Sequence, residues 1–143
     1  MMRFSGFFLE GFSEYLALQA NKEVFGEEFY RQQLKNYIEY TADLDVVPVS
    51  EIKNSDEIDD TYRYSYVPLL LSAFEKEIGM ENMWKWMQTI LKTPQPVKTH
   101  YEFFKSSLVD KVISREQFKK LEARFINNPD AWNKIIETIN RKP

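Results

Sequence analysis

The spacing of apolar residues constrains the fold most, because it is helical along almost the whole chain. Apolar side chains recur at intervals of three and four residues, the period of one helix face. No stretch shows the sustained apolar–polar alternation of a half-buried strand. The sequence therefore predicts an all-α fold, a packed array of about seven helices. We expect them at roughly 8–23, 26–42, 63–78, 80–92, 99–109, 114–126 and 129–140.

Residues that start helices support this prediction. Thr99 with Glu102, and Ser114 with Gln117, form capping boxes, in which a side-chain oxygen and a side chain three residues later satisfy free backbone N–H groups. The pair Asn128-Pro129 fits an N-cap followed by proline at the first helical position. These signals predict helix starts near residues 99, 114 and 129.

The length favours one domain, since 143 residues suffice for one core but hardly for two. With 43% hydrophobic residues the chain can fill such a core. We expect a single helical domain over 1–143. The turn Pro94-Gln95-Pro96 separates an N-terminal portion, 1–93, from the C-terminal helices, 94–143.

Composition excludes several classes of function. The net charge of -3 predicts no nucleic-acid binding, and no apolar run is long enough for a membrane span. The apolar start is interrupted at Glu10, too early for a signal peptide, so the compartment stays open. Without cysteine there is no disulfide or thiolate chemistry. With His100 as the single histidine, one copy of this chain cannot form a site that needs two.

Glu10 is the first candidate functional residue, because it is a carboxylate among Phe7, Phe8, Leu9 and Phe12. A carboxylate in apolar surroundings requires a partner. An arginine, a helix N-terminus or a metal ion would each serve, and the residues alone leave these alternatives open.

The segment Glu10-Gly11-Phe12-Ser13-Glu14-Tyr15 resembles a motif of aminopeptidase N-type zinc peptidases, which are gluzincins. In that family a His-Glu-x-x-His helix supplies two zinc ligands and the general base. A second helix, about eighteen residues later, supplies a glutamate ligand within a motif close to Asn-Glu-Gly-Phe-Ala-Glu-Tyr. The resemblance implies that Glu10 occupies the third zinc-ligand position, with Leu9 replacing the asparagine.

A second resemblance covers the segments 48–52 and 60–64. Pro48-Val49-Ser50-Glu51-Ile52 and Asp60-Thr61-Tyr62-Arg63-Tyr64 are similar to a loop and helix start of the family. By this match Tyr64 is the donor to the oxyanion intermediate, with Tyr66 as the second choice. The lysine and glycine that follow in the family are absent. Tyrosines here also fit half-buried packing, and Pro68 requires a helix that starts near Ser65 or one that starts earlier and bends.

The other parts of such a site are missing from the sequence. It has no His-Glu-x-x-His, and the usual spacing does not fit into the nine residues before Glu10. The family's substrate-amine loop is absent too. We expect Glu14 to face packing or solvent and His100 to lie on the surface. The chain alone is therefore predicted to bind no zinc or other cofactor and to hydrolyse no peptide, its enzymatic status depending on the missing segment.

Three hypotheses for function follow. In the first, the chain is a truncated or split piece of a zinc metallopeptidase hydrolase, equivalent to the C-terminal helical subdomain of a thermolysin-like catalytic domain. An upstream segment would complete it for peptide substrates. In the second, it is a non-catalytic helical interaction module derived from such a peptidase. In the third, the match is a coincidence. Substrate specificity and exo- versus endopeptidase action stay open.

The resemblance also implies an exposed surface. In the family the helix of Glu10 packs on the His-Glu-x-x-His helix. Without that helix, Phe4, Phe7, Phe8 and Phe12 are expected to form an apolar patch. Large exposed patches favour association. We therefore predict self-association through these phenylalanines, or coverage of the patch by residues 1–8.

Overall fold

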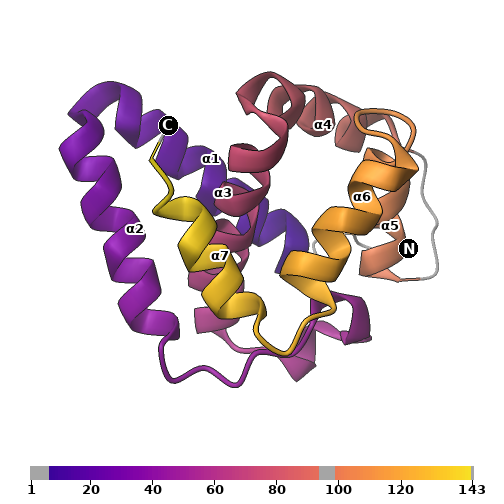
Figure 1. Cartoon of the computed structure of the whole chain (residues 1–143), viewed down its shortest axis with the longest axis horizontal. Helices are drawn as coiled ribbons and strands as arrows, with labels where there is room; N and C mark the ends of the chain where they lie inside the picture. Colours follow the sequence, from indigo (N-terminus) through magenta and orange to yellow (C-terminus); the bar gives the residue numbers. More distant parts are fainter. Residues whose placement is uncertain (1–6, 94–98, 143) are drawn as a thin grey trace.

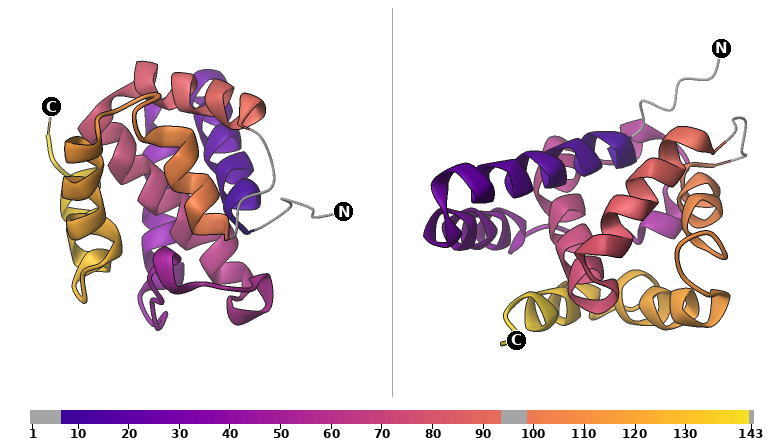
Figure 2. Two further views of the ribbon diagram at one scale, coloured as in Figure 1. Left: turned by 90° about the vertical axis from the view of Figure 1, so that its right-hand side faces the viewer. Right: turned by 90° about the horizontal axis from the view of Figure 1, so that it is seen from above.

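The computed structural model describes residues 7–93 and 99–142, and over these residues the protein is all-α, as predicted. Figure 1 shows the helices and Figure 2 two further views. Within the described chain only an isolated bridge joins Val109 to Ile113, and no strand forms. The α-helices are α1 (Phe7–Phe25), α2 (Glu27–Thr41), α3 (Val67–Ile78), α4 (Met80–Lys92), α5 (His100–Leu108), α6 (Arg115–Leu121) and α7 (Ala131–Ile139).

Two π-helices extend this set. The π-helix η3 (Tyr62–Tyr66) leads into α3, and η4 (Glu122–Ile126) continues α6. Short 3₁₀ turns, η1 (Val49–Glu51) and η2 (Ser55–Glu57), lie in the segment between α2 and η3. None of the helices in residues 7–93 and 99–142 combines the length and the apolar content of a membrane span.

Helix α3 forms the centre because its first two turns, residues 67–74, carry apolar side chains on every side. Its residues 67, 69–71, 73 and 74 have no exposed surface. A helix that is hydrophobic all round has to be covered on all sides. Helices α1, α2, α4 and α7 contact it, and both figures show it between α1 and α7.

An aromatic cluster fills the space between α1, α3, α4 and α5. The fully buried Trp86 meets Phe12 edge-on at 5.1 Å between ring centroids, and Phe104 at 5.0 Å. Its indole N–H donates to the Ser107 hydroxyl at 2.8 Å, which satisfies a buried polar group. The apolar core is thus continuous between the portions 1–93 and 94–143.

The predicted phenylalanine patch is altered by this packing. Phe12 is 3% exposed and belongs to the core, because its ring lies against Trp86, so it offers no surface for association. Phe4 and the side chains of Phe7 and Phe8 lie outside the described part of the structure. Self-association through them stays a prediction.

The helix starts agree with the capping signals at two of three places. Ser114 and Gln117 form the complete capping box, and the Thr99 hydroxyl accepts the backbone N–H of Glu102. The start near 129 was wrong, since α7 begins at Ala131. Instead, the Asn128 side chain accepts the backbone N–H of Asp130 at 2.8 Å and closes a turn before the helix.

Candidate functional site

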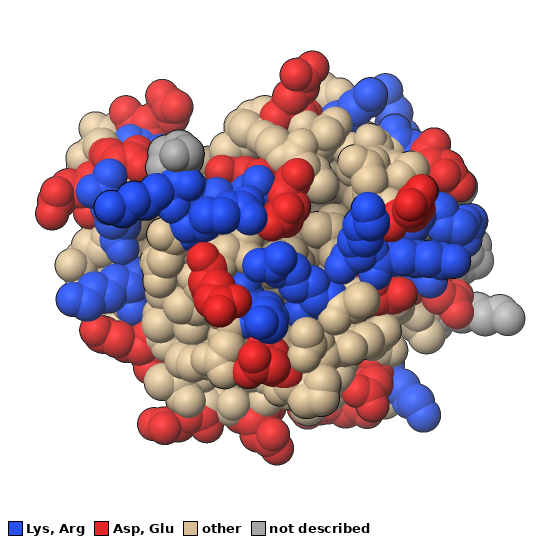
Figure 3. All heavy atoms as spheres, viewed as in Figure 1, with Lys and Arg blue, Asp and Glu red and all other residues tan. Residues whose placement is uncertain are grey.

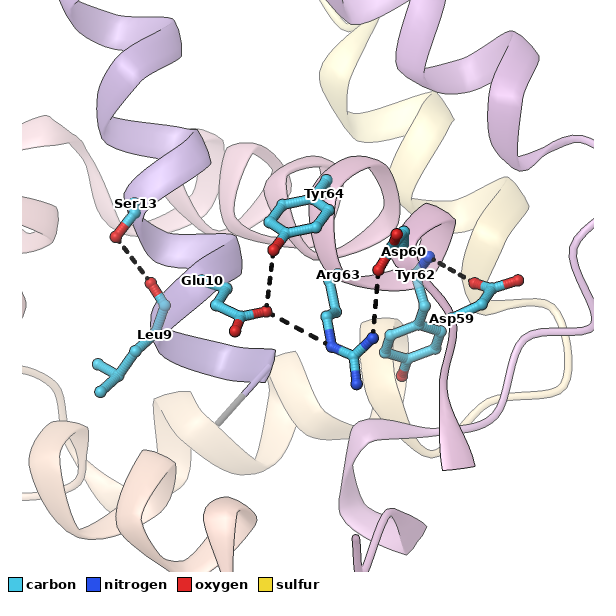
Figure 4. A network of polar contacts seen from close by, with 8 residues as sticks. All are labelled: Leu9, Glu10, Ser13, Asp59, Asp60, Tyr62, Arg63 and Tyr64. Atoms are coloured by element: carbon cyan, nitrogen blue, oxygen red, sulfur yellow. Dashed lines mark hydrogen bonds and ion pairs between the residues drawn. The ribbon is translucent and has the colours of Figure 1, made fainter. Parts of the chain in front are cut away.

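Glu10 and Tyr64 are in contact, although 54 residues separate them in the sequence. The Tyr64 hydroxyl donates to Oε2 of Glu10 at 3.3 Å. Figure 4 shows the two side chains pointing toward each other from α1 and η3. Tyr64 is 39% exposed and the Glu10 side chain 38%, so the contact lies at the surface. Glu10 and Tyr64 were named from two different motifs as parts of one site, and they lie together in the structure.

Arg63 provides the cationic partner of Glu10. Its Nε lies 3.5 Å from the same Glu10 oxygen, and its Nη1 lies 3.4 Å from Oδ1 of Asp60. Glu10 also lies in the first turn of α1, where the helix dipole favours a negative charge. An exposed ion pair of this kind contributes about 0–1 kcal/mol. Two of the three partners expected for this carboxylate, an arginine and a helix N-terminus, are thus present.

Gly11 allows α1 to approach η3 and α3 closely enough for this contact. A Cβ atom on Gly11 would lie 2.3 Å from Cγ1 and 2.5 Å from Cβ of Val67. It would also lie 3.1 Å from the backbone oxygen of Arg63. Carbon atoms pack at about 3.5–4.0 Å, so no side chain fits here. Gly11 therefore lets α1 pack closely against Val67 and the Arg63 backbone, and Glu10 is the residue directly before this contact.

The π-helix η3 resolves the question that Pro68 raised. The helix starts before Tyr64, with the Asp59 carboxylate accepting the backbone N–H of Tyr62 at 3.0 Å. Pro68, in the first turn of α3, has no N–H for the Tyr64 carbonyl four residues earlier. The wider turn shifts the pairing by one residue, and Val67 N–H donates to the Tyr62 carbonyl. A π-turn of this type is frequent at functional sites.

The three tyrosines of η3 have different surroundings. Tyr62 is buried and its hydroxyl donates to the Val47 carbonyl. Tyr66, the second choice for the oxyanion donor, is 2% exposed and packs 4.9 Å from the Tyr62 ring, where burial raises its pKa. Tyr64 is the exposed one. The charge of Glu10, followed by desolvation and their hydrogen bond, raises the pKa of Tyr64, so its phenol keeps its proton at neutral pH.

The remaining titratable residues named from the sequence lie elsewhere. Glu14, one helical turn after Glu10, lies beside Tyr37 of α2, and burial and then the Glu14 charge raise the pKa of Tyr37 to about 12. His100 opens α5, half-buried rather than on the open surface, and this burial lowers its pKa. Neither Glu14 nor His100 therefore provides a second metal ligand beside Glu10.

The first segment of the second motif, residues 48–52, contributes to another part of the surface. Pro48 and Glu51 line a cavity of about 660 Å³ together with Trp132. The Trp132 indole N–H donates to the buried Thr41 hydroxyl at 2.9 Å. Residues 48–52 thus shape the chain that leads to η3. They bring neither Pro48 nor Glu51 to the Glu10–Tyr64 contact.

The residues present do not by themselves fit a zinc ion. Catalytic zinc takes three protein ligands, whereas the resemblance implies that role for Glu10 alone. Over residues 7–93 and 99–142, no three His, Cys, Asp or Glu side chains gather as a metal site. The role of Arg63 as the partner of Glu10 was not predicted from the sequence. The signal that could have indicated it is its position directly before Tyr64.

No model of a protein family matches this chain. A search among curated proteins gave no match either, and neither did a search among solved structures. The family resemblance therefore rests on the two sequence motifs.

Proposed function

We propose that this chain is the C-terminal helical portion of the catalytic domain of an aminopeptidase N-type zinc peptidase, of the thermolysin-like type. Glu10 would hold the third zinc-ligand position and Tyr64 the position of the oxyanion donor. The observation that carries the proposal is the 3.3 Å contact between the Tyr64 hydroxyl and the Glu10 carboxylate. A coincidental match of two short segments gives no reason for these two side chains to meet.

Three features of the chain suit these positions. Gly11 lets α1 cross Val67 without a side chain between them, which holds Glu10 near η3. The Tyr64 phenol already donates to the Glu10 carboxylate, and a phenol can likewise donate to a developing negative charge. Both side chains are partly exposed, so a substrate or a further segment could reach them.

Peptide hydrolysis belongs to a completed protein in this proposal. The zinc of such a peptidase, when bound, activates a water molecule and polarises the scissile carbonyl. This chain offers one ligand position, and Arg63 already neutralises it at 3.5 Å. We therefore propose that a His-Glu-x-x-His segment from outside this chain is required, and that the chain alone is inactive.

A second candidate function is a non-catalytic helical interaction module derived from such a peptidase. The arrangement of Arg63 between Glu10 and Asp60 favours it, because the arginine forms an ion pair with each carboxylate. In that case the cluster holds α1 on η3 and has a structural role. The two candidates differ in what precedes this chain in its gene.

The reading frame before the Met1 codon separates the two candidates. A His-Glu-x-x-His sequence about eighteen codons before Glu10 is the result expected for the peptidase portion. A frame that has a stop codon in that interval favours the interaction module and contradicts the first proposal.

Zinc content tests the state of the isolated chain. We expect no stoichiometric zinc in the purified chain by elemental analysis after dialysis against a zinc salt. The variants Glu10→Ala and Glu14→Ala form a matched pair of carboxylate removals one helical turn apart. Stoichiometric zinc that Glu10→Ala removes and Glu14→Ala retains would show a complete site, contrary to the proposal.

A further inference from the structure

A groove of about 700 Å³ lies between α2, α3 and α7. Its floor is aliphatic, with Leu34 and Ile38 from α2 and Ile136 and Ile139 from α7. Leu34 and Ile139 are buried, and the two other side chains are half-buried. The volume lies within the range of about 300–1,000 Å³ that is typical of binding sites. The groove is independent of the Glu10–Tyr64 contact.

The rim of the groove is strongly basic. Glu27 is the one carboxylate among the residues that line it, whereas the whole chain carries a net charge of -3. Figure 3 shows Lys and Arg side chains gathered over α2 and the C-terminal end of α7. Positive charge is therefore concentrated at this groove, although the net charge of the whole chain is negative. The basic lining residues are Arg31, Lys35, Lys76, Arg141 and Lys142.

Most of these cations form no ion pair in the described part of the chain. Arg141 pairs with Glu77 at 3.0 Å. Over residues 7–93 and 99–142 no ion pair includes Arg31, Lys35, Lys76 or Lys142. Arg31 and Lys35 lie one turn apart on α2, and such like-charged pairs cost about 0.2–0.5 kcal/mol. An anionic partner would remove this repulsion.

We propose that this groove binds an acidic amphipathic helix of another protein. The floor offers Leu34 and Ile38 at a spacing of four, and Ile136 and Ile139 at a spacing of three, for an apolar stripe. The cations stand on both walls, so carboxylates on either side of that stripe would each meet a positive charge. A helix that binds in a groove inserts apolar anchors at such spacings, and flanking charges of opposite sign favour the encounter.

Other anionic partners suit the groove less well. A nucleic acid would need rings for stacking, but Tyr30, the one aromatic lining residue, is 9% exposed. A membrane surface is bound by protruding apolar side chains, whereas Leu34 and Ile139 lie buried on the floor of the groove. A small inorganic anion would leave the aliphatic floor unused.

The acidic segment 56–60 of a second copy is also a poor occupant. Its apolar residue, Ile58, is buried in its own chain. The Glu57 carboxylate accepts the backbone N–H of Lys53 at 2.7 Å, and Asp59 accepts that of Tyr62 at 3.0 Å. These contacts would have to break before the segment could enter the groove.

The test is the binding of a fluorescein-labelled helical peptide of about fourteen Glu, Leu and Ala residues, followed by fluorescence anisotropy. At 1.5 Å per residue it spans about 21 Å, close to the length of the 15-residue α2. We expect saturable binding, and about tenfold weaker binding by Arg31→Glu/Lys35→Glu. The matched control, Arg115→Glu/Lys119→Glu, makes the same charge change on an exposed face of α6 at the same spacing and should change affinity less than about twofold.

Four results would overturn the proposal. The first is an absence of saturable binding by the folded wild-type chain. The second is an equal loss in both double variants, which would indicate attraction by overall charge. The third is equal binding of the same peptide with lysine in place of glutamate. The fourth is tighter binding of single-stranded DNA, or of vesicles containing an anionic lipid, in competition with the peptide. Circular dichroism verifies that each variant is folded.

Discussion

The substitution Gly11→Ala examines the closest helix contact of the site. The new Cβ would lie 2.3 Å from Cγ1 and 2.5 Å from Cβ of Val67. Val67 has no exposed surface, so it cannot move into solvent. Overpacking of this kind costs about 1–3 kcal/mol, and distances this far below contact point to the upper end. Alanine regains about 1 kcal/mol of helix propensity. The expected net loss is therefore about 2 kcal/mol.

Urea unfolding followed by circular dichroism at 222 nm measures this loss. The melting temperature should fall by roughly 3–4 °C for each kcal/mol in a chain of this length, or about 6–8 °C in total. Ser13→Ala is the matched control, because Ser13 is exposed on the same helix. Its free energy of unfolding should change by no more than about 0.5 kcal/mol.

The double variant Gly11→Ala/Val67→Ala tests the cause of the loss. Removing Cγ1 of Val67 relieves the 2.3 Å contact but leaves its Cβ at 2.5 Å, so recovery should be partial. We expect the two changes to be less than additive by about 1 kcal/mol. The reasoning fails if Gly11→Ala is as stable as the wild type or more stable, or if the two effects simply add.

Two further predictions concern buried side chains. Burial raises the pKa of Tyr30 and Tyr37 to about 12, whereas unfolded tyrosines titrate near 10. The stability from these groups is therefore full below about pH 10 and falls as the pH rises toward 12. Urea unfolding between pH 8 and 12 measures this fall, and a flat profile contradicts it. Trp86→Phe removes the N–H that donates to Ser107 at 2.8 Å and leaves a cavity, for an expected loss of about 2 kcal/mol. A loss below about 0.5 kcal/mol in urea unfolding would show that this contact contributes little.

Apolar periodicity predicted the helices because burial follows one face of each helix. The expected segment 80–92 and the helix Met80–Lys92 coincide. The expected segment 63–78 is present too, but as η3 followed by α3. The π-turn shifts the pairing by one residue over a single turn, which is too short a stretch for apolar periodicity to reveal, and only Pro68 pointed to a disturbance. The start of α7 was misplaced because an Asn-Pro pair favours a turn as well as an N-cap.

The site was predictable only in part. The motifs named Glu10 and Tyr64, but they left open which partner the Glu10 carboxylate would take. Arg63 reaches it because η3 and α1 approach each other at Gly11, which is a property of the packing. The basic groove was also hidden, since its cations come from α2, from α3 and from the segment after α7, which periodicity cannot orient relative to one another.

The pKa of Tyr64 tests most directly whether Tyr64 and Glu10 form one site. Tyrosine labelled with ¹³C at the ring carbon that bears the hydroxyl allows its titration to be followed by NMR, and Tyr64→Phe assigns the signal. The contact predicts a pKa above the ordinary value, because the Glu10 carboxylate opposes ionisation of the phenol. Glu10→Gln should lower this pKa toward the ordinary value, whereas Glu14→Gln should leave it unchanged. A Tyr64 pKa that does not respond to Glu10→Gln would contradict the account.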